Sequence, residues 1–439
     1  VQKRLSRLQK TDVRRWARIA PLPTNWPGMS KDQRRTDFAH RVLEQAWQLH
    51  QQPHNHATDP ASGKCISLGL IRMANIAPLF DVALAIYQLG APAPGVRVHL
   101  CVYHAQYPLL LRSAIEQQLD ALLNRRGAQG GPDPALQRPA LRALIDAHPE
   151  PHHLFIVLGS PVTEVGRDHD YDWAVVEPSS MRSLIQLAGR VRRHRPGAVA
   201  GVNMAVLDSN LRRYEHSDQA AFCKPGFETN HPPFQFKSHD LHDLLAREMQ
   251  GAASWAVDAQ PRISLAAGGL FPKGCLVDLE HVRMHDAMLP RPEGSHPTPP
   301  VRAASLHWAH PGHLWLTGLL PQYQRFRHDT QPHDEVVWLP DEDEETLQLH
   351  RVADGERRGD KLYIRVQDSL CHPVPEQQLS APGVSPWLRL SLMDELTTLA
   401  QAQGLSLRQC AQRYATARLP RSELNGWWYH EALGFAVKK

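Results

Sequence analysis

Two arginines near the middle of this sequence have the residue type and spacing best suited to chemistry. The segment QLAGRVRR contains Gln186, Gly189, Arg190 and Arg193 as a short repeat. On a helix, Arg190 and Arg193 would project from the same face, since residues three apart are neighbours there. Guanidinium groups stay charged and offer forked N–H donors, which suits two of them to a polyphosphate. The segment therefore predicts a site for phosphate groups.

Two predicted strands and a helix would position this segment. The apolar runs Leu154–Leu158 and Trp173–Glu177 are typical of buried strands. The loop between them carries Gly166 and then three aspartates, Asp168, Asp170 and Asp172. Open α/β sheets bind their ligands at the carboxyl ends of strands, which is where this loop begins. The helix that follows is expected to span residues 179–195, from a serine cap to the Pro-Gly pair that ends it.

Strands and helices alternate on both sides of this unit. Further strands are expected at Cys65–Ile71, Val96–Tyr103 and Val202–Leu207, and further helices at residues 77–89, 109–122 and 136–147. Helices of this length between strands imply parallel pairing with right-handed crossovers. Residues 62–208 are therefore predicted to form one α/β domain with a parallel sheet.

The rest of the chain is predicted to form three other parts. Residues 1–61 indicate a basic helical lead-in, because the first 19 residues carry seven Lys or Arg and one acid. Such a helix could follow a phosphate backbone or be a plain solvated face. The alternation stops after residue 208, so residues 209–300 are expected to be a linker and helical wrap. Residues 301–439 are expected to form a small C-terminal domain whose last aromatic residues anchor it.

Composition narrows the class of protein. A chain of 439 residues with 42% hydrophobic residues can bury the cores of two or three domains. Its net charge of +4 is too small to indicate nucleic-acid binding by itself. The six cysteines form no CxxC pair, which argues against structural zinc and fits a reducing compartment. With no apolar run of roughly 18 residues and no signal peptide, we expect a soluble, cytoplasmic protein.

Four short segments resemble a known family. QLAGRVRR and SPVTEVGRD resemble the last two signature motifs of superfamily 2 helicases. Together with GLIRMANI upstream and FCKPGFE downstream, they resemble the helicase-nuclease of type I-F CRISPR systems. The resemblance implies that residues 62–208 are the second RecA-like domain of an ATP-dependent single-strand DNA translocase. It also implies a C-terminal portion that lacks the nuclease and the first RecA-like domain, which fits a sequence that starts at Val1.

The same resemblance assigns roles at the nucleotide. Arg193 would be the arginine finger and Arg190 a second phosphate contact, whereas Gln186 would couple the nucleotide to the domain interface. Asp168, after Gly166, would meet the ribose or hold the arginines in place. ATP with Mg²⁺ would be shared with the absent first domain, which supplies the phosphate loop, so this chain alone is expected to hydrolyse no ATP. The plain alternative is a surface helix whose arginines pair with acids.

Other loops at the carboxyl ends of the same strands are the predicted contacts for one strand of DNA. By resemblance, the contact residues are Ser160, Thr163, His104, Arg112, Arg72 and Asn75. Hydroxyl and basic side chains can bond phosphate oxygens without reading the base sequence. Each residue alone is a weak signal, because a histidine after a strand is more often a satisfied structural group.

The resemblance implies partners as well. In that family a crRNA-guided surveillance complex opens target DNA, and the helicase-nuclease pulls and degrades the displaced strand. Contacts with the adaptation machinery, and the metal of the nuclease, are expected only in regions outside this chain. Several His-Asp dipeptides, at residues 239, 242, 285, 328 and 333, are not expected to hold a metal. The alternatives are a non-catalytic RecA-like module that binds nucleic acid or protein, and a superfamily 2 helicase of DNA repair or RNA remodelling.

Overall fold

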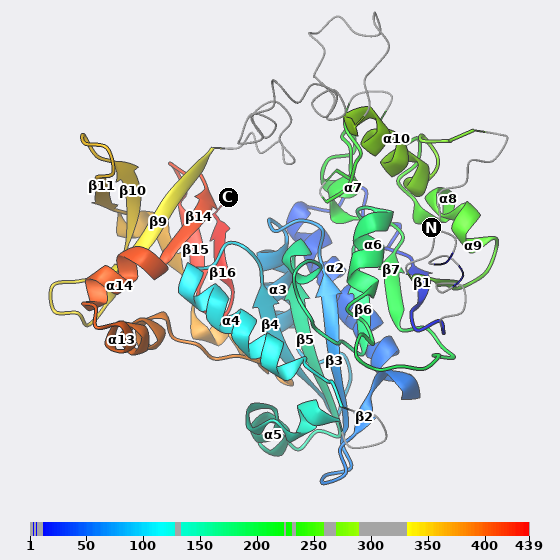
Figure 1. Ribbon diagram of the computed structural model, residues 1–439, viewed down its shortest axis with the longest axis horizontal. Helices are drawn as coiled ribbons and strands as arrows, with labels where there is room; N and C mark the ends of the chain where they lie inside the picture. The colour runs from blue at the N-terminus through cyan, green and yellow to red at the C-terminus, as the bar shows by residue number, and fades with distance from the viewer. Residues whose placement is uncertain are drawn as a thin grey trace, which may run out of the picture.

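The computed structural model describes residues 3, 6, 12–127, 133–223, 225–230, 234–258, 269–288 and 332–438. Over these residues the protein is a mixed α/β structure built around a large sheet, and the C-terminal strands lie beside one edge of that sheet (Figure 1). Within the same ranges, no helix combines the length and the apolar character needed to cross a bilayer.

The central sheet is mainly parallel. Its strands run in the order β13-β4-β5-β3-β6-β7-β1-β8, with β2 paired to the start of β3. All neighbours from β4 to β1 pair in parallel, which confirms the predicted RecA-like α/β class. The strand bounds are β1 (Trp16–Ala20), β2 (Ala57–Thr58), β3 (Cys65–Arg72), β4 (Val96–Tyr103), β5 (His152–Gly159), β6 (Trp173–Val176), β7 (Met204–Leu207), β8 (Trp255–Ala256) and β13 (Val384–Pro386).

Helices cover both faces of this sheet, as a parallel sheet requires. On one face α2 and α3 share a hydrophobic core with Leu154 and Ile156 of β5, and on the other α4, α5 and α6 share a core with Phe155. Successive residues of β5 thus enter different cores, because the side chains of a strand alternate between faces. The helix bounds are α2 (Lys31–His50), α3 (Leu79–Leu89), α4 (Leu109–Leu122), α5 (Pro139–Asp146), α6 (Met181–Ala188), α7 (Leu211–Glu215), α8 (Leu241–Leu244), α9 (Ala246–Met249) and α10 (Leu276–Met288).

The C-terminal residues form two smaller sheets that pack on the α/β domain. One sheet has the order β11-β10-β9-β14 and the other β12-β15-β16, whereas β13 extends the central sheet beside β4. Trp427 is fully buried and donates from its indole N–H to the Pro420 carbonyl at 3.0 Å, which confirms the predicted aromatic anchor. The bounds are β9 (His333–Pro340), β10 (Leu347–Asp354), β11 (Lys361–Arg365), β12 (Cys371–Pro373), α13 (Leu392–Gln403), α14 (Leu407–Tyr414), β14 (Thr416–Pro420), β15 (Trp427–His430) and β16 (Gly434–Val437).

Three local predictions are wrong. Residues 16–20 form β1 rather than part of a basic helix, because pairing with β7 at the edge of the sheet outweighs local propensity. The helical piece expected over residues 240–255, within the predicted linker and wrap, is broken into α8 and α9 at Leu245 and is followed by β8. The helix expected over residues 179–195 ends at Ala188. The central sheet also takes strands β1, β8 and β13 from outside residues 62–208.

Candidate functional site

The arginine segment, residues 189–195, turns away from α6 instead of continuing it. After Ala188 the backbone bonds with Tyr171 in place of a further helical turn. Tyr171 N–H donates to the Arg190 carbonyl at 2.8 Å, and Arg192 N–H donates to the Tyr171 carbonyl at 2.9 Å. The two arginines predicted at the phosphates therefore do not share a helix face, and that part of the prediction is wrong.

Buried Asp170 fixes the backbone of the arginine segment. Its carboxylate accepts the backbone N–H groups of Arg193 and His194 at 3.1 and 3.2 Å. The Arg195 guanidinium donates to the same carboxylate at 3.0 and 2.8 Å, and it also pairs with Asp172 at 2.6 Å. Asp170 and Asp172 are both buried. These two aspartates, predicted near a ligand, thus hold the fold instead.

An exposed ion pair lies at the end of this anchored segment. The side chains of Arg193 and Asp168 are 40% and 44% exposed, and Arg193 Nε donates to the Asp168 carboxylate. Burial raises the pKa of Asp168, but hydrogen bonds from Arg193 and His194 outweigh it and lower this pKa to about 2. Gly166 turns the loop with a φ of +73°, which glycine adopts without steric cost. Gly166 and Gln186 are both exposed.

The Arg190 side chain points toward the loop between β5 and β6. Its Nε and Nη2 donate to the Glu164 carbonyl at 3.1 and 2.9 Å, and Nη1 donates to the Arg167 carbonyl. Burial, together with the charge of neighbouring Arg193, lowers the pKa of Arg190. The Arg190 side chain is only partly exposed, whereas Arg193 is exposed, so Arg193 is the more accessible of the two guanidinium groups.

The structure buries four of the six predicted DNA-contact residues. Each of them is at most 1% exposed: Arg72, His104, Thr163 and Ser160. His104 donates from Nε2 to the Leu433 carbonyl at 2.8 Å, and its Nδ1 accepts the Gln106 N–H at 3.1 Å. Side chains enclosed in this way cannot reach a phosphate. We therefore assign structural roles to these four residues in place of the predicted DNA contacts. Asn75 and Arg112 keep contact with solvent.

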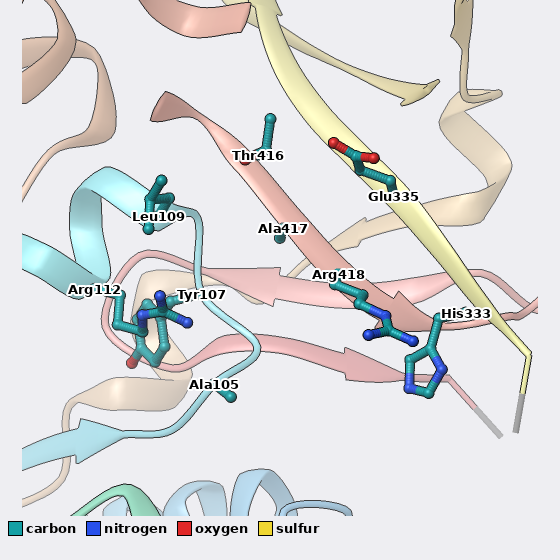
Figure 2. A pocket seen from close by; sticks show the side chains of 9 residues that line it. All are labelled: Ala105, Tyr107, Leu109, Arg112, His333, Glu335, Thr416, Ala417 and Arg418. Carbon is teal, nitrogen blue, oxygen red and sulfur yellow. The ribbon is translucent and has the colours of Figure 1, made fainter. Parts of the chain in front are cut away.

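A groove separates the α/β domain from the C-terminal strands, and its volume is about 460 Å³ (Figure 2). Tyr107 and Arg112 line one wall, and His333 and Glu335 of β9 line the other with Arg418 of β14. Figure 2 shows the two arginines projecting from different walls. Basic side chains that face one open space favour an anionic ligand.

Backbone contacts join the loop that carries Tyr107 to β16 of the C-terminal part. The Phe435 N–H donates to the Gln106 carbonyl at 2.8 Å, next to the bond from His104 to Leu433. Between them Gly434 has a φ of +70°, and a Cβ there would lie 2.8 Å from the Gln106 carbonyl oxygen. Burial lowers the pKa of His104 to about 4, although its bond to the carbonyl opposes the shift. A neutral histidine and a close backbone approach therefore hold this loop, which ends at the groove, against β16.

Two acids that position α6 were missed by the sequence analysis. Glu280 of α10 accepts the N–H groups of Met181 and, at 3.1 Å, Arg182, so it caps the first turn of α6. Burial raises the pKa of Glu280 to about 7. Nothing near α6 in the sequence indicates an acid that arrives 99 residues later. Glu164, in contrast, lies inside SPVTEVGRD, where an acid among small and apolar residues was a visible signal.

The described ranges contain no group of three or more His, Cys, Asp or Glu side chains that could hold a metal ion. Among the His-Asp dipeptides, His239 bonds to Glu228 at 2.8 Å and His242 to its neighbour Asp240 at 2.9 Å. His328 lies outside the described residues.

Known proteins resemble this chain over nearly its whole length. Residues 65–196 match the family CRISPR-associated nuclease/helicase Cas3, C-terminal, and residues 338–437 match the CRISPR-associated Cas3 subtype I-F/YPEST-like, C-terminal domain. The CRISPR-associated nuclease/helicase Cas3 subtype I-F/YPEST of Pseudomonas aeruginosa is 41% identical over 99% of this chain. The chain belongs to this Cas3 family.

The chain spans 37% of the length of that Cas3 relative. A second Cas3 of the same subtype, from Pectobacterium atrosepticum, is 38% identical over 79% of this chain and 30% of its own length. The crystal structure of T. fusca Cas3 is 17% identical, with a TM-score of 0.31 over 46% of this chain and 19% of its own. A CRISPR RNA-guided surveillance complex in a pre-nicking state has a chain 17% identical, with a TM-score of 0.27 over 45% of this chain and 19% of its own.

Proposed function

We propose that this chain provides the second RecA-like domain of an ATP-driven, single-strand DNA translocase in CRISPR defence. The observation that carries the proposal is the geometry of Arg193. Its guanidinium is exposed beside Asp168, while its backbone N–H is bound by buried Asp170. A fixed backbone with an accessible head group suits an arginine that stabilises charge on a phosphoryl group across a domain interface.

ATP would bind between this domain and a second RecA-like domain of the motor. This side contributes cations, with Arg193 at the phosphates and Arg190 behind it, and exposed Gln186 and Gly166 complete the proposed nucleotide site. The ion pair with Arg193 favours a role for Asp168 in holding that arginine. Because the segment presents guanidinium groups, we assign the phosphate loop and the ligands of Mg²⁺ to the other domain. Bound Mg²⁺ neutralises charge on the phosphates.

The substitution Arg193→Ala in the full-length protein tests the proposal. We expect DNA-stimulated ATP turnover to fall by about 10³-fold or more, as for other arginine fingers, while single-strand DNA affinity stays within about twofold. Arg182→Ala is the matched control, since Arg182 is exposed on α6 and its loss removes the same charge. ATP turnover that is indifferent to Arg193→Ala would contradict the proposal and favour a non-catalytic binding module.

The DNA strand is proposed to follow the groove in Figure 2, where Arg112 and Arg418 face it from two elements. Each phosphate contact contributes about 0.7 to the slope of log affinity against log salt for single strands. Arg112→Ala and Arg418→Ala should each reduce the slope by about this amount. Arg408→Ala, exposed on α14 outside the groove, should leave it unchanged. If both groove variants keep the original slope, the strand takes another path.

The full-length protein is proposed to be recruited by a crRNA-guided surveillance complex and to degrade the strand that it pulls. Support comes from membership of a family whose relatives are named nuclease/helicase. The nuclease metal and contacts with the adaptation machinery are proposed for parts outside this chain, in a cytoplasmic protein. This chain alone is expected to hydrolyse no ATP. Robust DNA-stimulated ATPase activity of the purified chain would contradict that assignment.

A further inference from the structure

Glu164 occupies the middle of the loop that follows β5. On one side lie Ser160 and Thr163, and four residues later the loop reaches Asp168. The Glu164 side chain is 2% exposed, and no role was assigned to it from the sequence. Its backbone carbonyl is the acceptor for Arg190 Nε and Nη2, at 3.1 and 2.9 Å. A shift of this residue therefore moves the acceptor that holds Arg190.

The carboxylate of Glu164 makes a second connection to the arginine segment. It accepts the hydroxyl of Ser183, in α6, at 2.7 Å, and it lies 2.8 Å from Nε of Arg72, the last residue of β3. Arg72 Nη2 in turn donates to the Ser183 hydroxyl at 2.7 Å. The three side chains form a closed triangle of contacts among β3, the loop and α6.

The desolvation of two charged groups makes this triangle a weak source of stability for the fold. Arg72 is 0% and Glu164 2% exposed, so both charges are removed from water. Burial raises the pKa of Glu164, and the charge of Arg72 and the bond from Ser183 only partly offset it. An apolar pair of similar volume is often as stable as a buried ion pair. What the charged triangle adds is a directional link, because the hydrogen bonds of Ser183 with Glu164 and Arg72 fix the loop and α6 in one relative position.

We propose that Glu164, with Arg72 and Ser183, is a positioning residue that transmits strand binding in the groove of Figure 2 to the arginine segment. The inference rests on the proposed function. Arg112 of the groove lies 3.9 Å from Glu116, and Glu116 pairs at 2.5 Å with Arg167, three residues after Glu164 in the loop. A strand that displaces Arg112 therefore shifts the loop, and with it the Glu164 carboxylate and carbonyl. The carboxylate then shifts α6 through Ser183, and the carbonyl shifts Arg190. No contact of Arg72 with DNA is needed.

Glu164→Gln in the full-length protein tests this link, since it keeps the size of the side chain and removes its charge. ATP turnover without DNA should stay within about twofold, whereas stimulation by single-stranded DNA should fall by about tenfold in kcat. KM for ATP and the affinity for single-stranded DNA should change by less than about twofold. Ser183→Ala, which removes one hydroxyl, should lose part of the stimulation with the same unchanged KM.

Glu215→Gln is the matched control. Glu215 forms another buried ion pair, with Arg35 at 2.7 Å between α2 and α7, which are separate from the loop and the arginine segment in the sequence. Its loss should cost stability and leave the stimulation intact. If Glu164→Gln does not fold, Ser183→Ala decides the question. Full stimulation in the folded Glu164 and Ser183 variants would overturn the inference, and so would a loss of DNA affinity that accounts for the defect. Indifference of ATP turnover to Arg193→Ala would instead refute the proposed function itself.

Discussion

Asp170→Ala should release the arginine segment from the domain. The substitution removes a fully buried carboxylate that binds two backbone N–H groups at 3.1 and 3.2 Å and two guanidinium nitrogens of Arg195. Loss of one partner from a buried ion pair costs about 3–5 kcal/mol, because the other charge stays buried without its match. Arg195 keeps Asp172 at 2.6 Å, so we expect a value at the lower end, about 3 kcal/mol.

Urea unfolding and limited trypsin digestion measure this effect. Wild-type protein should resist cleavage within residues 189–195, and Asp170→Ala should be cut there at urea concentrations below global unfolding. Asp354→Ala is the control, because Asp354 is 96% exposed and pairs with Lys361 only at 3.7 Å. An exposed pair of this kind is worth less than about 1 kcal/mol. If Asp170→Ala costs no more than the control and leaves the segment protected, Asp170 does not anchor the arginines.

Two buried groups give opposite dependences of stability on pH. His104 has a folded pKa of about 4, below its ordinary value near 6.5, so stability should be lost as the pH falls between these values. In urea titrations, His104→Gln should reduce this acid-induced loss of unfolding free energy by up to about 3 kcal/mol. The same loss in the variant as in the wild type would contradict the prediction. Glu280 has a folded pKa of about 7, above its ordinary value near 4.5, so its contribution should decline as the pH rises through this range. The stability of Glu280→Gln relative to wild type should therefore improve from pH 4.5 to 7, and a constant difference would be evidence against the buried acid.

Much of the α/β domain could be predicted because its signals are local. The residues that form β4 and α4 were predicted with the bounds that the structure has, since apolar periodicity and length identify such elements directly. The order of strands and helices then indicated parallel pairing. The strands added by residues 16–20 and 384–386 could not be predicted, because their partners β7 and β4 are far away in the sequence.

The candidate site was predictable in its residues and much less so in its geometry. Arg193 and Asp168 were singled out together, and they form an exposed pair. Arg72 and His104 were expected to face DNA, yet one is enclosed by Glu164 and Ser183 and the other by the C-terminal strands. Burial of a polar side chain depends on what packs over it, and in both cases the covering residues come from other elements.

By itself, the sequence determined the α/β class, the family and the choice of arginines, because these depend on residue type and short spacing. Tertiary structure decided which guanidinium is accessible, which aspartates bind groups within the protein, and where α6 ends. The physical reason is that a helix stops, and a charge turns inward, when distant backbone and carboxylate groups offer better partners than the next turn or the solvent. Tyr171, Asp170 and Glu164 are those partners here.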